Sequence, residues 1–179
     1  MYFITICTHN RECLFGEIVG AHSHGAYSHG AYNHGAYSHT PLPQSIMQLN
    51  AYGEIVRDEW LKTPSIRTYV ILGEWVIMPN HIHVILIITH AGRGVWPYAP
   101  TNTVAGFRSP SHTVGAIVRG FKSAVTKQIN IQRGTPGQPV WQRNYWEHII
   151  RDEHSYVNIA NYIHNNPATW QADKLYAVP

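Results

Sequence analysis

The sequence of 179 residues contains only two cysteines, Cys7 and Cys13. Neither lies at a spacing typical of metal ligands, and so few cysteines exclude a disulfide framework. The amino-terminal residues also lack the basic, apolar and small-residue order of a secretory signal. We therefore expect a reducing, cytoplasmic environment, in which both cysteines have structural roles.

Long hydrophobic runs are missing as well. The longest, residues 84–88, is far shorter than the roughly 20 residues that span a bilayer, so no membrane association is expected. Hydrophobic residues nevertheless make up 44% of the chain, which excludes wholesale disorder. This length predicts one domain, residues 1–179, with a core of its own.

Acidic residues are scarce in the middle of the chain. Residues 91–151 hold eight Lys and Arg against the single acidic residue Glu147, whereas each flank has a net charge of −2. A basic segment with Trp141, Tyr145 and Trp146 nearby is typical of proteins that bind a phosphate backbone. An ordinary basic surface would show the same charge.

Histidines, in contrast, are abundant, and five of the 13 lie in a five-residue repeat over residues 21–40. A period of five fits neither a helix nor a strand, so the repeat predicts a low-complexity loop insertion. A weak histidine-rich metal tract is the alternative.

The remaining pattern alternates between strand and helix signals. It predicts strands at 2–8, 67–78, 81–89 and 140–150, helices at 51–62, near 118–129 and at 152–165, and a flexible loop at 91–113. This order predicts an α+β fold, a ferredoxin-like βαββαβ antiparallel sheet with an added C-terminal helix.

Two histidines lie on one predicted strand. Because side chains alternate along a strand, His81 and His83 point to one face and Ile82 to the other. Two imidazoles so placed can bind one metal ion, although a His-x-His pair alone is a weak signal.

The last predicted helix places Asn158, Tyr162 and Asn166 along one side, one turn apart. Tyr156, Ile159 and Ile163 form its apolar side. A tyrosine on the polar side of a helix can pack against its neighbours, or it can act as a nucleophile beside a metal ion.

Several short motifs occur together and in order. They are Met78-Pro79-Asn80-His81-Ile82-His83, Phe121-Lys122-Ser123, Trp141-Gln142-Arg143, Glu147-His148-Ile149-Ile150-Arg151, Tyr162-Ile163 and Asn165-Asn166-Pro167. In this combination the chain resembles the REP-associated tyrosine transposases, which are single-tyrosine HUH endonucleases. The resemblance covers most of the chain and implies a prokaryotic, metal-dependent DNA strand transferase.

The resemblance implies a role for each matching residue. His81 and His83 match the HUH metal ligands, Asn166 matches a third polar ligand, and Tyr162 matches the catalytic tyrosine. The implied cofactor is Mg²⁺ or Mn²⁺, and the implied product is a 5′-phosphotyrosine intermediate with a free 3′-hydroxyl.

The implied partner is single-stranded DNA near a REP-like hairpin, with no nucleotide cofactor, and a homodimer is one option for the assembly. Basic residues of the middle segment would contact phosphates, and aromatic side chains would stack on bases. The residues proposed for DNA contact are Arg119, Lys122, Lys127, Arg143 and Arg151.

Three alternatives accompany this interpretation. A non-catalytic nucleic-acid-binding protein would use the same sheet and basic helix. An inactive transposase relic would fit the absence of a basic and aromatic leader before the first strand. A zinc hydrolase is disfavoured, because Val84 and Ile85 follow His83 where a third ligand would be expected.

Overall fold

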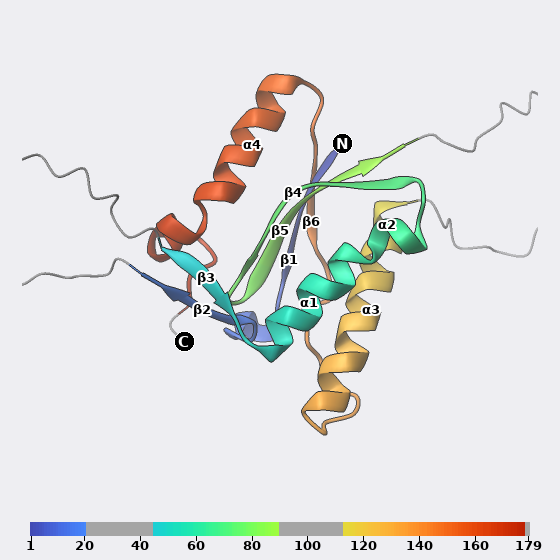
Figure 1. The fold of residues 1–179 in the computed structure, drawn as a ribbon, viewed down its shortest axis with the longest axis vertical. Coiled ribbons are helices and arrows are strands. Elements are labelled where there is room, and N and C mark those ends of the chain that lie inside the picture. The colour runs from blue at the N-terminus through green and yellow to red at the C-terminus, as the bar shows by residue number, and fades with distance from the viewer. Residues whose placement is uncertain (21–44, 90–112, 178–179) are drawn as a thin grey trace, which may run out of the picture.

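A four-stranded antiparallel sheet forms the centre of the computed structural model, which describes residues 1–20, 45–89 and 113–177 (Figure 1). Its strands are β1 (Tyr2–Cys7), β4 (Val70–Met78), β5 (His81–Ile88) and β6 (Trp146–Ile149), and they lie in the order β4-β5-β1-β6. The first strand of the βαββαβ unit thus lies between the third and the fourth, as in ferredoxin-like folds. The predicted fold class is confirmed.

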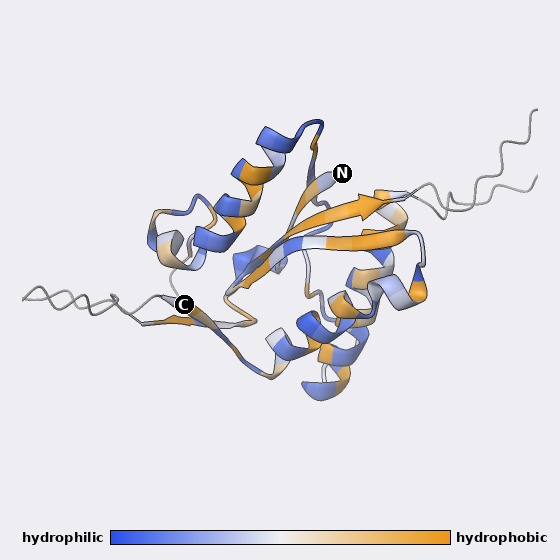
Figure 2. Ribbon diagram, turned by 45° about the horizontal axis from the view of Figure 1, so that its top comes forward, coloured by the Kyte–Doolittle hydropathy of each residue, from blue (hydrophilic) through white to orange (hydrophobic). Residues whose placement is uncertain are grey.

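Two longer helices, α1 (Ala51–Leu61) and α3 (Val114–Gln132), cover one face of the sheet, and the short α2 (Thr63–Ile66) joins α1 to β4. The Asn50 side chain caps α1, accepting hydrogen bonds from two backbone N–H groups at 2.9 and 3.0 Å. The even-numbered residues of β5 pack beneath these helices, and Figure 2 shows the hydrophobic strands against helices with one apolar side.

The predicted C-terminal helix, α4 (Glu153–Asn165), covers the opposite face. Asp152 caps it by accepting a hydrogen bond from Ser155 N at 2.7 Å. Ile163 is buried against Phe3 and Ile85, so the odd-numbered residues of β5 face α4. The helix ends at Asn165, as predicted, and a 3₁₀ helix, η2 (Pro167–Ala172), follows.

A second, two-stranded sheet was not predicted. Strands β2 (Gly16–Val19) and β3 (Ile46–Leu49) pair antiparallel, after a short 3₁₀ helix, η1 (His9–Arg11). The predicted insertion at 21–40 falls between these strands and outside the described residues. The predicted loop at 91–113 also lies outside them, apart from Thr113, which caps α3.

The strand predicted at 140–150 is wrong in its first half, since β6 begins only at Trp146. The ammonium of Lys122 donates hydrogen bonds to three consecutive backbone carbonyls, those of Gln142, Arg143 and Asn144, at 2.5, 3.2 and 3.4 Å. These carbonyls turn towards helix α3 and interrupt the strand there. Among the described residues, no helix combines the length and the apolar character that crossing a membrane requires.

Candidate functional site

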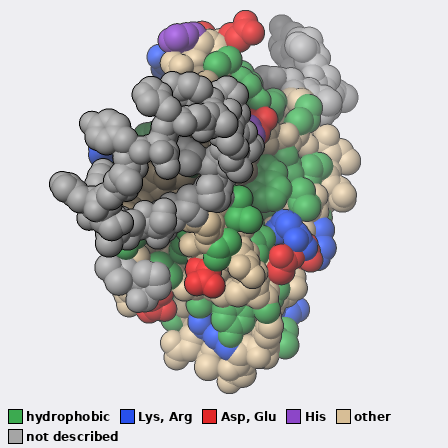
Figure 3. Space-filling model, turned by 60° about the vertical axis from the view of Figure 1, so that its left-hand side comes forward, with side chains coloured by type: hydrophobic (Ala, Val, Ile, Leu, Met, Phe, Trp, Pro, Cys, Tyr) green, Lys and Arg blue, Asp and Glu red, His purple; other side chains and the backbone are tan. Residues whose placement is uncertain are grey.

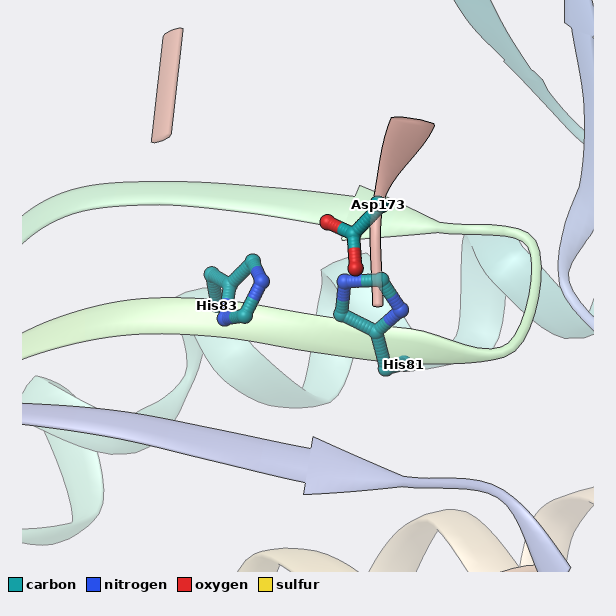
Figure 4. A group of neighbouring side chains, drawn as sticks. All are labelled: His81, His83 and Asp173. Atoms are coloured by element: carbon teal, nitrogen blue, oxygen red, sulfur yellow. The ribbon is translucent and has the colours of Figure 1, made fainter. Parts of the chain in front are cut away.

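His81 and His83 lie at the start of β5, directly after the turn that joins it to β4. Figure 4 shows both side chains projecting from one side of β5 towards Asp173. Their ring centroids are 4.4 Å apart, and both side chains are almost completely buried. The predicted common face is confirmed, and it is the face covered by α4.

Asn80 orients the ring of His81. The Asn80 amide nitrogen donates to Arg11 O at 3.2 Å and to Leu175 O at 2.8 Å, so its oxygen is the atom that lies 2.8 Å from His81 Nδ1. This network assigns the His81 proton to Nδ1. The lone pair of Nε2 is therefore directed into the site, where Nε2 is buried and has no hydrogen-bond partner among the described residues.

His83 is held between strand β1 and helix α4. Its Nδ1 lies 2.8 Å from the Thr5 hydroxyl, and its Nε2 lies 3.2 Å from the Tyr162 hydroxyl. Because the Thr5 hydroxyl can donate or accept, it supports either tautomer of His83. Nε2 can consequently serve as a donor to Tyr162 or as a ligand to a cation.

Tyr162 lies on the solvent-facing side of α4 and is 44% exposed. Its ring packs edge-on against Phe3, and its hydroxyl donates to Asp173 Oδ2 at 3.2 Å. Desolvation by burial, followed by the negative charge of Asp173, raises the pKa of the Tyr162 phenol to about 12. The phenol is thus held in its protonated form beside two imidazoles.

Asp173 completes this group and was not predicted. Burial raises the pKa of its carboxyl, but hydrogen bonds from Leu175 N and Asn166 and the nearby imidazoles outweigh that effect and lower the pKa overall. The ligand atoms of Asp173, His81 and His83 all lie within 4.8 Å of one another. Two imidazoles and one carboxylate at this spacing can hold one divalent cation.

The segment that contains Asp173 is anchored to the turn between β4 and β5 and to residues 11–13. Asn80 binds Leu175 O as described above, Arg11 Nη1 donates to Lys174 O at 3.4 Å, and Cys13 Sγ donates to Ala177 O at 3.5 Å. No local sequence pattern predicts these contacts, because Asp173 lies after α4 in an irregular segment. Only the tertiary structure brings its carboxylate to the histidines.

Asn166, the residue predicted as the third ligand, is fully buried at the end of α4. Its Nδ2 donates to Asp173 Oδ2 at 2.9 Å, which leaves Oδ1 as a buried oxygen without a partner in the described part of the chain. Asn166 therefore orients Asp173, and its own oxygen is a further candidate ligand. Unpaired buried acceptors such as Asn166 Oδ1 and His81 Nε2 fit a bound cation.

A cavity of about 540 Å³ opens beside this group. Its lining includes Thr5, His83, Trp146 and Tyr162, together with Thr169 and Ala172 of η2 and residues 173–175. Tyr162 and Asp173 are thus reachable from solvent through this cavity, although both histidines are buried.

The basic residues predicted to contact DNA are spread over two regions. Arg119, Lys122 and Lys127 lie on α3, which covers the sheet face opposite the histidines. Burial lowers the pKa of the Lys122 ammonium, which is engaged by the backbone carbonyls described above. Arg143 is exposed and lines a groove of about 510 Å³ with Lys122 and Lys127.

Arg151, in contrast, follows β6 and lines a smaller hollow near the beginning of α4. On the face shown in Figure 3, basic side chains are interspersed with acidic ones. The structure does not bring the five predicted basic residues together at the histidine site.

The buried histidines predict how stability depends on pH. Burial lowers the pKa of His83 to about 4, and burial together with the neighbouring imidazole lowers that of His81 as well, from an ordinary value near 6.5. The unfolded chain therefore binds more protons than the folded chain as the pH falls below about 6.5. We expect the melting temperature of the metal-free protein in EDTA to fall between about pH 6.5 and pH 4.

The double variant His81→Gln/His83→Gln should have a flatter melting profile over this range, whereas His154→Gln, at an exposed site on α4, should keep the wild-type slope. Asp173 contributes little over most of this range, because a carboxyl with a lowered pKa loses its stabilising effect mainly as the pH falls below its ordinary value of 3.8. If the double variant kept the wild-type slope, His81 and His83 would not be the groups that cause the pH dependence of the melting temperature.

Comparison with known proteins places the chain among relatives. No protein-family model matches it. An uncharacterized protein of Haemophilus influenzae is 40% identical over 177 residues, which cover 98% of this chain and 84% of that protein. The chain belongs to the same family as this protein.

Among solved structures, a REP-associated tyrosine transposase bound to a REP hairpin superimposes with a TM-score of 0.52 and 17% sequence identity. The match covers 97% of this chain and 69% of that one. The chain therefore has the transposase fold.

Proposed function

We propose that the protein is a metal-dependent, single-tyrosine DNA endonuclease and strand transferase that acts on single-stranded DNA near a hairpin. One observation supports this most directly: the Tyr162 hydroxyl lies 3.2 Å from His83 Nε2 and 3.2 Å from Asp173 Oδ2, beside an open cavity. The transposase fold and the resemblance in sequence motifs point to the same chemistry.

In the proposed reaction the Tyr162 oxygen attacks the scissile phosphorus. A bond forms between the two, and the bond from phosphorus to the 3′-oxygen breaks. The phenolic proton is released to solvent, the departing 3′-oxygen takes up a proton from solvent, and the products are a 5′-phosphotyrosine and a free 3′-hydroxyl. Attack by a 3′-hydroxyl reverses the step, so no nucleotide cofactor is required.

The residues that would hold the cation are His81, His83 and Asp173, with Asn166 Oδ1 as a further candidate. Bound there, Mg²⁺ or Mn²⁺ would polarise the scissile phosphate and favour the phenolate. The chain itself contributes the orientation, since Asn80 fixes the tautomer of His81, and Asn166 and Leu175 N fix the carboxylate.

The test is covalent capture of DNA. The wild-type protein, incubated with Mn²⁺ and single-stranded oligonucleotides that contain a labelled hairpin from its own genomic surroundings, should form an adduct that survives denaturation. Excess EDTA should abolish the adduct, and renewed Mn²⁺ should restore it. If no adduct forms on any such hairpin under these conditions, the proposal is wrong.

A zinc hydrolase is a second candidate, because Asp173 supplies the acidic third ligand that the sequence motif lacks. Two histidines and a carboxylate with an open position occur in catalytic zinc sites. Such an enzyme would cleave its substrate without becoming attached to it. Cleavage in the presence of Zn²⁺ with no adduct would therefore favour the hydrolase.

A further inference from the structure

Trp146 is an exposed aromatic residue at the edge of the candidate site. It is the first residue of β6, which pairs with β1 at the edge of the four-stranded sheet, and 55% of it is exposed. It also lines the cavity that contains His83 and Tyr162. A large exposed aromatic ring thus lines the same cavity as the Tyr162 hydroxyl and the His83 imidazole.

The buried Phe3 side chain holds the Trp146 ring in its orientation. It packs edge-on against the buried ring of Phe3, with centroids 5.5 Å apart. The ring of Phe3 also packs against those of His83 and Tyr162, with centroid separations of 5.3 and 6.1 Å. The same aromatic residue therefore supports Trp146 and both reactive side chains, which places the indole at a defined position beside them.

His148 extends this surface away from the cavity. It lies two residues along β6, on the same face of the strand, and its ring is parallel to that of Trp146 within 5°, with centroids 6.0 Å apart. His148 lines the adjacent hollow together with Arg151. The rings of Trp146 and His148 thus form a continuous aromatic surface from the cavity towards the guanidinium group of Arg151.

We infer that Trp146 and His148 form a stacking platform for the unpaired nucleotides that flank the scissile phosphate. The inference rests on the proposed function and names the part of the substrate that the site would recognise. Unpaired bases offer free faces to aromatic rings, whereas bases inside a duplex are already stacked on each other. Lys174 at the cavity and Arg151 at the hollow are placed to meet the phosphates on either side.

The platform can be tested by binding without cleavage. In a Tyr162→Phe background, Trp146→Leu keeps an apolar cover over Phe3 but removes the aromatic face. We expect it to weaken the binding of a hairpin with a single-stranded flank by about 5- to 160-fold, the range for one lost base stack. Trp146→Phe should recover most of the affinity, and Ile66→Ala, at an exposed apolar site on α2, should have no effect.

An abasic scan of the flank locates the contact. In the parent protein, removal of one base should reduce the affinity by about the same factor, and that position should become neutral in Trp146→Leu. The platform is wrong if Trp146→Leu binds within about 2-fold of the parent or if its abasic profile is unchanged, since one stack should cost more.

The two proposals fail separately. Covalent adducts formed by protein with Tyr162 intact, combined with an unchanged abasic profile, would contradict the platform and leave the chemistry standing. A position-specific loss without any adduct would contradict the chemistry and support the platform.

Discussion

Replacement of Tyr162 by phenylalanine is expected to abolish covalent attachment to DNA, with a loss of at least about 1,000-fold, because removal of a nucleophile costs up to about 10⁶-fold in other enzymes. The change deletes only the hydroxyl, which lies between His83 and Asp173. The ring and its contact with Phe3 remain. Adduct yield on denaturing gels measures the effect, and fluorescence anisotropy should show that DNA binding persists.

Tyr156→Phe is the matched control. This tyrosine lies on the same helix but packs on its apolar side, near Ile163. Its variant should form adducts at the wild-type rate, and both variants should unfold within about 1 kcal/mol of the wild type, the usual value of one hydrogen bond. Persistent adducts in Tyr162→Phe would exclude Tyr162 as the nucleophile.

Replacement of His81 or His83 by alanine is expected to weaken Mn²⁺ binding by at least about 100-fold, since even residues that only orient a ligand are worth about 10- to 100-fold. Each change removes one of the two imidazole nitrogens that face Asp173. Adduct formation should fall in parallel at low Mn²⁺. Electron paramagnetic resonance measures free Mn²⁺ directly, so this result does not depend on activity.

His154→Ala, on the exposed beginning of α4, should bind Mn²⁺ like the wild type. The same titration tests whether Asp173 is a ligand. The variant Asp173→Asn preserves the shape of the side chain but removes its charge. We expect this variant to bind Mn²⁺ at least about 10-fold more weakly, because a neutral amide replaces the carboxylate and even residues that only orient a ligand contribute about 10- to 100-fold. Wild-type affinity in both histidine variants would place the metal elsewhere.

The sequence predicted those parts of the site that follow a regular period. His81 and His83 share a face because strand side chains alternate, and Tyr162 and Asn166 share a side of α4 because they are one turn apart. Caps and breakers such as Asn50 and Pro167 also act locally, so the ends of α1 and α4 were predicted closely. The roles of these residues came from the resemblance to a family.

The parts that were missed depend on contacts between distant segments. Asp173 lies in an irregular segment, and its position follows from hydrogen bonds to Asn166 and from the anchoring of Leu175 by Asn80. A strand was predicted over 140–150. The Lys122 ammonium on helix α3 interrupts it, because it binds the backbone carbonyls of residues 142–144. Hairpin β2–β3 was hidden by the repeat between its strands.

The anchoring of Leu175 by Asn80 joins residues that are 95 positions apart in the chain. At a synthesis rate of about 5 to 20 residues per second, His83 leaves the ribosome about 5 to 20 seconds before Asp173 does. A nascent chain therefore has both imidazoles before it has the tyrosine and the carboxylate that face them. The complete group of side chains exists only after the last β-strand and helix have been synthesised, so partly made chains cannot contain the assembled group.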